Sequence, residues 1–394
     1  MKSSPRSQAG AAGTLQVLNV AMVGHAFMGR AHSNAYRQVN HFFDLPLQVV
    51  PAVVVGRDLA RAGEAAQKFG FAEATTDLDA VLADPDIHVI DVATPNDSHF
   101  PIAMAALRAK KHVLCEKPLA MTLEQTKEMA ALAKKNKVRV ALWHNYRRAP
   151  ATMLAAQMIA RGDIGAVRQV RAVYLQDWLS SADMPASWRT SKKACGSGAH
   201  GDLNAHLIDL TRALTGLEFD AVCGVQQTFT KERPTGKGKQ KAKVDVDDAF
   251  CFLAKFKAKG KGSSAIGTYE ATRVAPGRKN YNCIEISGEK GAIRWNLERM
   301  NELEVFSFAD PADGQGFRTV MCMDGVHPYA ANWWPDGHIV GYEHTFVHHV
   351  ADFVTALAGK QPFHPDFDDG VAVQAVLEAS LASVKKGGWV KVAR

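Results

Sequence analysis

The sequence contains no apolar run of 18 or more residues, which argues against a transmembrane helix. Residues 1–16 lack the apolar stretch of a signal peptide and carry only Lys2 and Arg6 as charges, so we expect a disordered tail there. No internal repeat is present. Together these absences predict a cytoplasmic globular protein with no membrane partner.

Cysteine is sparse, and none of the six cysteines has the C-x-x-C spacing of a zinc site or a redox motif. We expect reduced, mostly buried thiols, with a zinc site or a disulfide framework as the alternatives. The six are Cys115, Cys195, Cys223, Cys251, Cys283 and Cys322.

The sequence also lacks a basic module with interleaved aromatic residues, which argues against a nucleic-acid partner despite a formal net charge of +7. Part of that charge lies in the segment GKGKQKAK, which contains Lys237, Lys239, Lys241 and Lys243. The segment has no apolar period and contains two glycines, so it predicts a solvated loop. An alternative use of the excess charge is attraction of an anionic cofactor.

What is present suffices for two domains, because the chain has 394 residues and is 47% hydrophobic and 22% charged. Through residues 17–145, short apolar runs alternate with helical patterns, which predicts βαβ units and a parallel sheet. Through residues 146–394, strand-like stretches with alternating polarity cluster between flanking helical patterns. The expected fold class is α/β, an N-terminal doubly wound Rossmann domain followed by an α+β domain with a mostly antiparallel open sheet.

The first apolar run, LNVAMVG, leads into a small-residue turn. Gly24 and Gly29 take the first and third small positions of a dinucleotide-binding fingerprint, and Ala26 replaces the middle glycine. Phe27 and Met28 complete the turn, and the helix that follows would offer free N–H groups to a pyrophosphate. An ordinary βα turn is the alternative interpretation.

The end of the second strand reads Gly56-Arg57-Asp58. An acidic residue at this place binds the ribose diol of NAD, whereas an arginine accommodates the 2′-phosphate of NADP. Both residue types are present at adjacent positions, so the sequence predicts a cofactor-binding role for Arg57 and Asp58. The choice between NAD and NADP stays open, with NAD favoured.

Four motifs occur in a characteristic order: VGHAFMGRAHSNAY, ATPNDSH, CEKPLAMTLEQ and HGDLNAHLIDLTRALTG. Together they resemble the glucose–fructose oxidoreductase / inositol dehydrogenase (Gfo/Idh/MocA) family, over residues 18 to about 390. The stretches AFMGRAHSNAY, FFDLPL and GYEHTFVHHVADFV resemble its levoglucosan dehydrogenase branch. That branch oxidises anhydro-sugar or pyranoside hydroxyls.

The resemblance implies which residues contact cofactor and substrate. The family lysine of the E-K-P motif, here Lys117, touches the nicotinamide ribose and the substrate hydroxyl, and its bond to Pro118 is often cis. Besides the glycine turn, the implied cofactor residues are Thr94, Pro95, Asn96, His99, Glu116, Lys117, Asn145, Trp188 and Arg189. The implied substrate residues are Lys117, Asn145, Arg147, Asp202 and His206.

Alcohol oxidation requires a proton acceptor for the hydroxyl while a hydride leaves carbon. We assign this role to the imidazole of His206, with Asp202 four residues earlier on the same helical face. Lys117 would stabilise the developing alkoxide. We expect these three catalytic groups to converge on the nicotinamide.

No metal is expected, because hydride transfer needs none. His344 and His348 are four residues apart, a helical spacing that is compatible with metal binding, and His349 follows them; a structural role is favoured because no third ligand is evident. Two positions depart from the family pattern, Ala26 in the glycine turn and His200 in GSGAHGD, where a small residue is common. The second departure puts the shape of that loop in doubt.

The expected reaction is therefore NAD(P)-dependent oxidation of a secondary hydroxyl of a sugar, anhydro-sugar or inositol to a ketone. A cofactor-binding regulator without turnover is an alternative, as is an oxidoreductase that acts on an imine, an enone or a halogenated ring. An antiparallel sheet with one apolar open face would pair with a second copy, so we expect a homo-oligomer, either a dimer or a tetramer.

Overall fold

The structure is a computed structural model that describes residues 17–236, 240–258 and 264–393, so the expected tail at 1–16 lies outside the described residues. The chain divides into two compact units, each described here by itself. The first contains residues up to 120, 124–145 and 342–370, and the second contains 121–123, 146–341 and 371 onward.

A six-stranded parallel sheet forms the centre of the first unit, with strand order β3-β2-β1-β4-β5-β6. The strands are β1 (Val17–Val23), β2 (Gln48–Val55), β3 (Glu73–Thr75), β4 (Val89–Val92), β5 (His112–Cys115) and β6 (Val140–Leu142). Strands β1, β4 and β5 are buried almost throughout, as expected for strands covered on both faces, whereas the edge strand β3 is not. The order reverses between β1 and β4, which makes the carboxyl ends of these strands the expected ligand site. This arrangement confirms the predicted Rossmann sheet.

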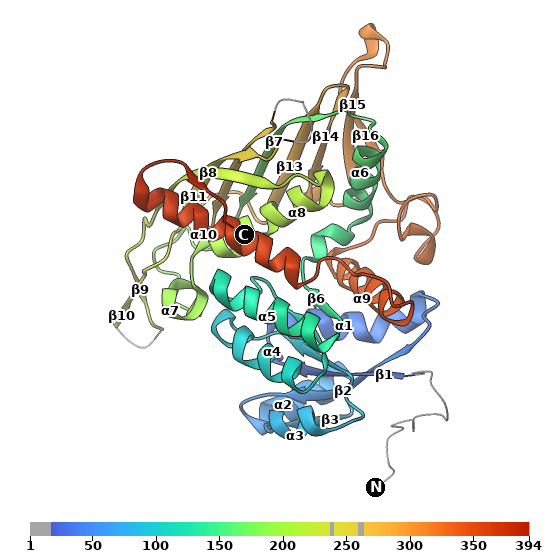
Figure 1. Cartoon of the computed structure of the whole chain (residues 1–394), viewed down its shortest axis with the longest axis vertical. Coiled ribbons are helices and arrows are strands. Elements are labelled where there is room, and N and C mark those ends of the chain that lie inside the picture. The colour runs from blue at the N-terminus through green and yellow to red at the C-terminus, as the bar shows by residue number, and fades with distance from the viewer. Residues whose placement is uncertain (1–16, 237–239, 259–263, 394) are drawn as a thin grey trace. The chain divides into compact units, whose positions relative to one another are not determined.

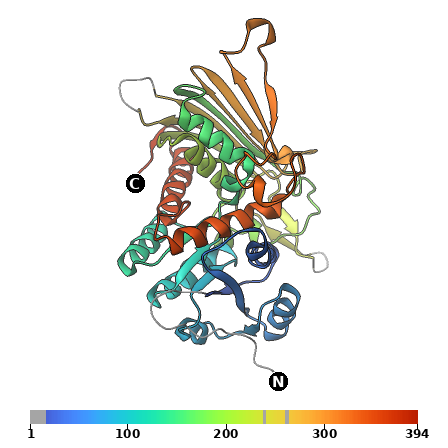
Figure 2. The same cartoon turned by 90° about the vertical axis from the view of Figure 1, so that its right-hand side faces the viewer.

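Helices cover both faces of this sheet, with α1 and α2 on one side and α4 and α5 on the other (Figures 1 and 2). Local sequence sets their ends: Asp58 caps α2 by accepting a hydrogen bond from the Arg61 N–H, and Gly70 ends that helix at φ +81°. The helices are α1 (Phe27–Phe42), α2 (Leu59–Phe69), α3 (Leu78–Ala83), α4 (His99–Arg108) and α5 (Leu123–Asn136).

One segment differs from the sequence-based division. Residues 342–370 were assigned to the second domain, but the structure includes them in the first unit, where α9 (Tyr342–Ala358) packs along α1. The physical reason is aromatic contact: the ring of His348 meets Phe43 edge-on at 5.9 Å, and His349 stacks on Trp143 at 4.5 Å. The 124–145 segment of the first unit ends at residue 145, and the second unit continues from residue 146.

The second unit is built on a nine-stranded sheet with order β16-β15-β14-β13-β7-β12-β11-β8-β17. Its neighbours pair antiparallel except β7 and β12, which are parallel. The strands are β7 (Val167–Leu175), β8 (Phe219–Gln227), β11 (Ala249–Phe256), β12 (Ile266–Thr272), β13 (Tyr281–Gly288), β14 (Gly291–Asn296), β15 (Glu302–Ser307), β16 (Arg318–Met321) and β17 (Val390–Lys391). This mostly antiparallel sheet confirms the predicted class.

The helices of this unit gather on one side of the sheet (Figure 2). Strand β11 shows the resulting alternation, since Phe250 and Phe252 are buried while Leu253 is exposed. The helices are α6 (Pro150–Arg161), α7 (Lys192–Cys195), α8 (Ala205–Thr215) and α10 (Phe367–Lys386), whose part from residue 371 belongs to this unit.

The lysine-rich segment is only partly a loop. Lys241 and Lys243 lie in β10 (Lys241–Lys243), which pairs antiparallel with β9 (Glu232–Pro234), while Lys237 and Lys239 lie outside the described residues. The expectation of a solvated loop is therefore wrong for residues 241–243, where hairpin pairing overrides the missing apolar period.

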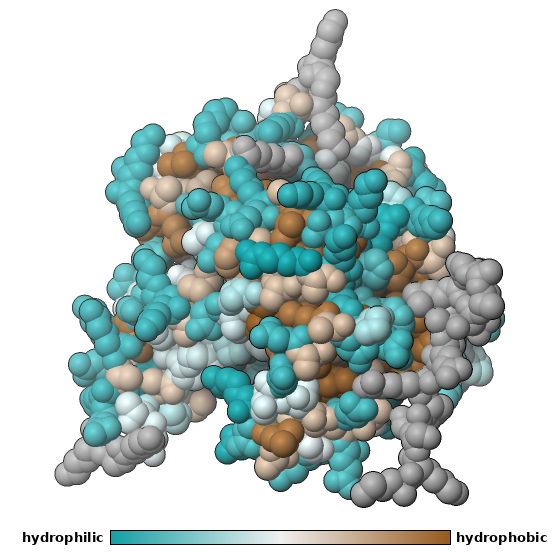
Figure 3. Space-filling view, turned by 60° about the horizontal axis from the view of Figure 1, so that its bottom comes forward, coloured by the Kyte–Doolittle hydropathy of each residue, from teal (hydrophilic) through white to brown (hydrophobic). Residues whose placement is uncertain are grey.

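Polar and charged residues cover most of the face shown in Figure 3, with apolar patches between them. Within the described part of the chain, no helix is both long and apolar enough to cross a membrane. All six cysteines are free thiols.

Candidate active site

The glycine turn follows β1 at the carboxyl edge of the parallel sheet. Gly24 adopts φ +96°, and its N–H donates to the Val55 carbonyl at 3.0 Å. A Cβ at Gly24 would lie 2.6 Å from the Ala93 carbonyl oxygen, and one at Gly29 would collide with the Gly24 carbonyl oxygen. Any side chain at either position would displace the turn, so this sequence needs both glycines to hold the first helix against the strand.

The start of α1 is suited to a pyrophosphate. Ala26 is exposed and extended, α1 begins at Phe27, and the first turn of the helix carries no acidic residue. Unpaired N–H groups and the positive end of the helix dipole therefore face a site without competing carboxylates. Phe27 is exposed, Met28 is half-buried, and the Ala26 methyl takes the place of the usual middle glycine.

Arg57 and Asp58 are both exposed after β2. Asp58 also has a local duty, because one carboxylate oxygen accepts the Arg61 N–H at 3.1 Å and caps α2. The sequence singled out Asp58 for a ribose contact but not for this cap. The two uses are compatible, since a carboxylate has a second oxygen.

His99 joins two turns that the sequence placed around the cofactor. Its ring nitrogens lie 2.9 Å from the carbonyl oxygens of Pro118 and of Thr94, and the ring is fully buried. Burial lowers the pKa of His99. Rather than lining an open groove, His99 ties the turn after β4 to the turn after β5. Pro95 and Asn96 lie in the short segment between Thr94 and His99, and Asn96 is buried.

The E-K-P turn follows β5. Glu116 is 4% exposed, Lys117 is half-buried, and the Lys117–Pro118 peptide is cis, as the family resemblance implied. One oxygen of the Glu116 carboxylate accepts the Lys117 N–H at 3.1 Å. The turn thus fixes the backbone from which the Lys117 side chain extends.

A buried polar cluster behind this turn was missed by sequence reasoning. His32 of α1 lies between two carboxylates, with Nδ1 at 2.9 Å from Asp91 and Nε2 at 3.0 Å from Glu116. Asp91 also accepts hydrogen bonds from the Tyr36 hydroxyl and the Trp143 indole N–H. The only signal for it was a histidine and a tyrosine in an apolar helix face.

Asn145 is the last residue of the 124–145 segment of the first unit, and it is 2% exposed. Its side-chain amide donates to the Thr345 hydroxyl of α9 at 2.8 Å. The structure therefore gives this predicted cofactor and substrate residue a link to α9 that the sequence did not suggest.

In the second unit, His206 lies in the first turn of α8, against an aromatic wall. Its ring centroid is 4.6 Å from that of Tyr146 and 5.8 Å from that of Tyr174, and the residue is 7% exposed. The two tyrosine hydroxyls hydrogen-bond each other at 2.8 Å, and Tyr174 donates to Asn280. His206 is thus held beside a string of hydroxyl and amide groups.

Asp202 precedes His206 in a π-helical turn, His200–Asn204, that leads into α8. Its carboxylate pairs with the Arg273 guanidinium at 2.7 Å, and Arg273 is almost fully buried. Arg273 also donates to the Arg189 carbonyl. The sequence indicated Asp202 as a neighbour of His206 but offered no sign of Arg273, which lies 71 residues away.

Arg147, expected at the substrate, is engaged elsewhere. Its guanidinium binds Asp209 through two hydrogen bonds, of 2.8 and 2.5 Å, and both side chains are buried. This bidentate pair holds the segment after β6 to α8. Neither the pairing nor Asp209 was predicted.

Trp188 and Arg189 form a short 3-10 turn capped by Ser187. The Arg189 guanidinium lies 4.2 Å from the Trp188 ring centroid, a cation–π distance. Trp188 also packs on an apolar cluster that contains Cys195 and Val244. Both residues remain partly exposed, which leaves them available to a ligand.

His200, the departure from the family pattern, is fully buried. Its ring stacks on Phe250 at 3.7 Å, and its nitrogens contact the Leu377 carbonyl and the Asn204 amide. The loop around it is pinned by Asp247, which accepts the N–H groups of Gly198 and His200. A large ring is therefore accommodated by a π-helical turn.

Two other clusters have structural explanations. His348 and His349 are buried against aromatic rings, as described for α9, and His344 lies 3.5 Å from Glu343. Among the described residues, His364, Asp366 and Asp369 lie close enough together to hold a metal ion.

The geometry of this last cluster is that of a helix cap. Asp366 accepts the N–H groups of Asp368 and Asp369 at the start of α10. Asp369 accepts the Asp366 N–H in return, as well as a hydrogen bond from His364. The reciprocal bonds form a capping box, so the cluster is explained by helix initiation.

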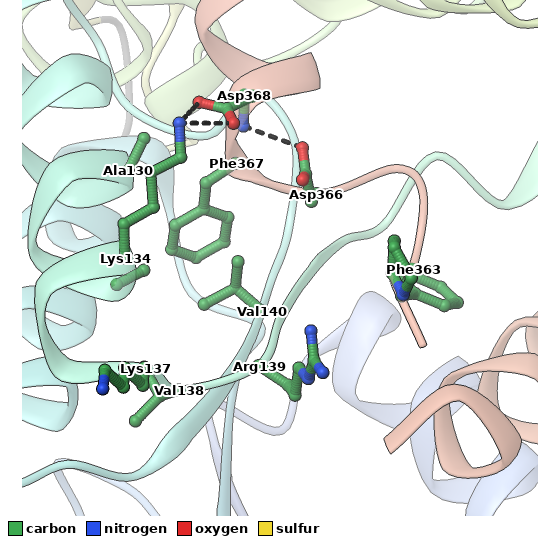
Figure 4. Close-up of a pocket in the computed structure, with 12 residues that line it drawn as sticks. Ala130, Lys134, Lys137, Val138, Arg139, Val140, Phe363, Asp366, Phe367 and Asp368 are labelled. Atoms are coloured by element: carbon green, nitrogen blue, oxygen red, sulfur yellow. Dashed lines mark hydrogen bonds and ion pairs between the residues drawn. The ribbon is translucent and has the colours of Figure 1, made fainter. Parts of the chain in front are cut away.

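A pocket of about 330 Å³ lies in the first unit, beside the amino end of β6 (Figure 4). Four of the charged side chains that line it are engaged within the protein: Lys134 pairs with Asp368, Arg139 donates to the Lys360 carbonyl, and Asp366 caps α10. The pocket lies at the amino ends of the parallel strands, whereas the glycine turn lies at their carboxyl ends. It is therefore separate from the predicted cofactor site.

Comparison with known proteins matches both parts of the chain. The family model "Oxidoreductase family, NAD-binding Rossmann fold" matches residues 18–144, and "GFO/IDH/MocA C-terminal domain" matches residues 152–294. Levoglucosan dehydrogenase of Pseudarthrobacter phenanthrenivorans is 41% identical over 387 residues, which cover 96% of this chain and 99% of the relative.

Solved structures agree. An oxidoreductase domain protein from Kribbella flavida has a TM-score of 0.93 and 45% identity, over 96% of this chain and 100% of that one. A levoglucosan dehydrogenase in complex with NADH and L-sorbose has a TM-score of 0.91 and 43% identity, with the same coverage of both chains.

Proposed function

Because this chain belongs to the Gfo/Idh/MocA oxidoreductase family, we propose that it oxidises a secondary hydroxyl of levoglucosan or a similar pyranose-like sugar to a ketone, with NAD as hydride acceptor. The relative that shares 41% identity over nearly the whole length of both chains carries the name levoglucosan dehydrogenase. This identity extends through the second unit, where a substrate would be selected.

One observation carries the choice of a sugar, namely the polar and aromatic surroundings of His206. Tyr146, Tyr174 and Asn280 present hydroxyl and amide groups in one hydrogen-bonded string. Gln176 and Trp178 extend that string from the end of β7. Sugar hydroxyls need donors and acceptors together with an apolar ring face, and this end of the second unit offers both.

The proton of the reacting hydroxyl is assigned to His206. An imidazole can accept a proton near neutral pH and return it to solvent between turnovers. Asp202, fixed by Arg273, is assigned to a neighbouring hydroxyl or to the charged form of the imidazole. Arg273 keeps this carboxylate in one place, so neither task requires it to reorganise.

The first unit contributes the cofactor cradle and Lys117. NAD, when bound, supplies the site that accepts the hydride. Gly24 and Gly29 leave no room for a Cβ, and the acid-free start of α1 suits a pyrophosphate. The ammonium of Lys117 would stabilise the negative charge that develops on the reacting oxygen. That Lys117 acts on the same carbon as His206 stays a prediction.

NAD is preferred to NADP in this proposal. Relatives with 42–43% identity are described as complexes with NADH, and Asp58 offers a carboxylate at the position that binds a ribose diol. The neighbouring Arg57 would favour a 2′-phosphate, so the ratio of kcat/KM with the two cofactors measures which side chain dominates.

The test is a steady-state assay of the purified chain with levoglucosan, D-xylose, D-glucose and myo-inositol, each with NAD and with NADP, followed by NADH or NADPH absorbance. We expect NAD reduction with levoglucosan and a loss of about 10²-fold or more in kcat for Lys117→Ala and for His206→Asn. Binding of NAD, measured by tryptophan fluorescence, should survive in His206→Asn.

Two results would contradict the proposal. Tight NAD binding without turnover on any of these polyols would favour a regulator. Unchanged turnover in Lys117→Ala would remove the lysine from the reaction. Activity with myo-inositol alone would support the proposed reaction but contradict the proposed substrate, which would then be an inositol.

We further propose that two copies associate through the open face of the nine-stranded sheet. Val225, Leu253 and Ile266 are 64%, 50% and 52% exposed there, and Leu253 stands opposite Cys223 across the β11–β8 pair. A shallow hollow of about 420 Å³ adjoins them. Packing this face against its own copy would remove the exposed apolar area from water by a two-fold interface.

Light scattering coupled to gel filtration tests the association. Leu253→Glu should shift the oligomer toward the monomer, whereas Leu59→Glu, an equally exposed leucine on α2 of the first unit, should not. A monomeric wild-type protein would refute the association.

We also propose that the protein is located in the cytoplasm. Six free cysteines support the cytoplasm or another reducing compartment. Cell fractionation with an antibody to this chain checks the location.

A further inference from the structure

The His32 cluster fills the interior of the first unit directly behind the E-K-P turn. His32, Asp91 and Glu116 are 0%, 0% and 4% exposed. His32 donates from Nδ1 to Asp91 and from Nε2 to Glu116, at 2.9 and 3.0 Å. A ring that donates from both nitrogens is an imidazolium, and two carboxylates on opposite sides stabilise that form.

The plane of the His32 ring is fixed by aromatic neighbours. Trp143 stacks on it at 4.0 Å with an interplanar angle of 21°, and Phe346 of α9 lies 5.5 Å away. Rotation of the imidazole would require both aromatic rings to move. His32 therefore presents its two N–H groups in set directions.

The two carboxylates are not equivalent. Asp91 receives three donors, namely His32, the Tyr36 hydroxyl and the Trp143 indole. Glu116 receives His32 on one oxygen and the Lys117 N–H on the other, at 3.1 Å. Removal of His32 leaves Asp91 with two donors, but it removes the contact that orients Glu116 on the side away from Lys117.

We propose that His32 is a positioning residue for hydride transfer: its Nε2–H clamps Glu116, and the clamped Glu116 holds the backbone N–H of Lys117, so that the Lys117 side chain starts from one fixed place and direction. This inference rests on the proposed catalytic role of Lys117. The Nδ1–H contact to Asp91 anchors the imidazole and has no direct path to Lys117.

Two substitutions separate these contacts. The side-chain amide nitrogen of asparagine can take a place near that of Nδ1 of histidine, and the amide nitrogen of glutamine a place near that of Nε2. His32→Asn thus retains the bond to Asp91 and loses the one to Glu116, whereas His32→Gln does the reverse. Both replace the same buried cation by a neutral amide, so each is the matched control of the other.

The assay is levoglucosan oxidation with NAD, with and without deuterium at the oxidised carbon. We expect kcat of His32→Asn to fall about 10- to 100-fold, as for a catalytic group displaced by about 1 Å, with KM for NAD changed less than about threefold. The deuterium isotope effect on kcat should rise, because hydride transfer becomes slower than product release. His32→Gln should keep kcat within about threefold of the wild type.

Tyr36→Phe serves as the stability control, because it removes a hydrogen bond to Asp91 without touching Glu116. It should lower the melting temperature and leave kcat and the isotope effect unchanged. Should His32→Asn fail to fold, Glu116→Gln provides the second test. Its amide has only one acceptor oxygen for two donors, so it should show the same fall in kcat and the same rise in the isotope effect.

Equal kcat values in His32→Asn and His32→Gln, with Lys117→Ala inactive, overturn the positioning role and leave the proposed function in place. Full activity of Lys117→Ala overturns the function on which this inference rests. A low kcat restricted to His32→Asn and Glu116→Gln, with NAD affinity retained, supports the clamp.

Discussion

Replacing Arg147 by methionine should destabilise the second unit far more than it weakens substrate binding. Arg147 and Asp209 are 9% and 2% exposed in their side chains, and their two hydrogen bonds measure 2.8 and 2.5 Å. Methionine keeps most of the side-chain length and removes the charge. Asp209 then loses both of these hydrogen bonds and the guanidinium charge, and breaking a buried ion pair in this way costs about 3–5 kcal/mol.

That loss is large compared with the free energy of unfolding of ordinary domains, about 5–15 kcal/mol. The double variant Arg147→Met/Asp209→Leu removes both charges together, and we expect it to recover most of the loss. Urea denaturation followed by tryptophan fluorescence of all three variants and the wild type gives the coupling free energy by a double-mutant cycle.

The same proteins provide the kinetic comparison. With a structural role for the pair, KM for levoglucosan in Arg147→Met should stay within about threefold of the wild type at a temperature where the variant is folded. If unfolding is unaltered while KM rises tenfold or more, the guanidinium binds substrate, as the family resemblance suggested, and the ion pair is incidental.

Three further predictions follow from the geometry. Gly24→Ala places a methyl group 2.6 Å from the Ala93 carbonyl in a backbone with φ +96°, so NAD affinity measured by calorimetry should fall about tenfold or more. Burial alone lowers the pKa of His32, but Asp91 and Glu116 raise it to about 9. The stability from this imidazolium, about 3 kcal/mol, is therefore fully present below pH 6.5 and is lost as the pH rises through 9, and melting curves of His32→Gln should lack this alkaline loss. Asp366→Ala removes the cap of α10 and should cost about 1 kcal/mol of unfolding free energy in urea titrations, by the same amount with zinc present or absent.

Acid behaviour has a separate source. Burial lowers the pKa of His200 to about 4, so its neutral form contributes stability above pH 6.5 that is lost as the pH falls toward 4. His200→Phe, which keeps an aromatic ring against Phe250, should lose less stability between pH 7 and pH 4 in melting curves than the wild type, and the part of the acid loss that comes from buried His99 and His112 should remain.

Local patterns gave most of the fold. The alternation of apolar runs and helical segments predicts the Rossmann sheet, and local residues also set the ends of its helices, as Asp58 and Gly70 do for α2. The need for glycine at positions 24 and 29 could also be predicted from local sequence. A Cβ at either position would collide with backbone atoms of the turn. Such constraints act between near neighbours in the chain or across one strand–helix turn.

The missing part consists of partners far apart in sequence. His32 meets Asp91 and Glu116 at separations of 59 and 84 residues, and Asp202 meets Arg273 at 71. No periodicity encodes such pairings, since each depends on the register of whole strands and helices. The resemblance to a family predicts roles for Lys117, Asp202 and His206 but does not indicate the side chains that contact them.

The packing of α9 along α1 affects how this protein is made. Translation reaches Tyr342 about 300 residues after Phe42, so a ribosome working at about 5–20 residues per second leaves the α9-binding side of α1 uncovered for about 15–60 s. Synthesis of the nucleotide-binding unit therefore begins first, but the unit is complete only after residues 342–370 have been made. A nascent chain in this interval exposes the side of α1 that α9 later covers, including Tyr36 and Val39 among its buried residues, and we expect the yield of folded enzyme to depend on a ribosome-associated chaperone.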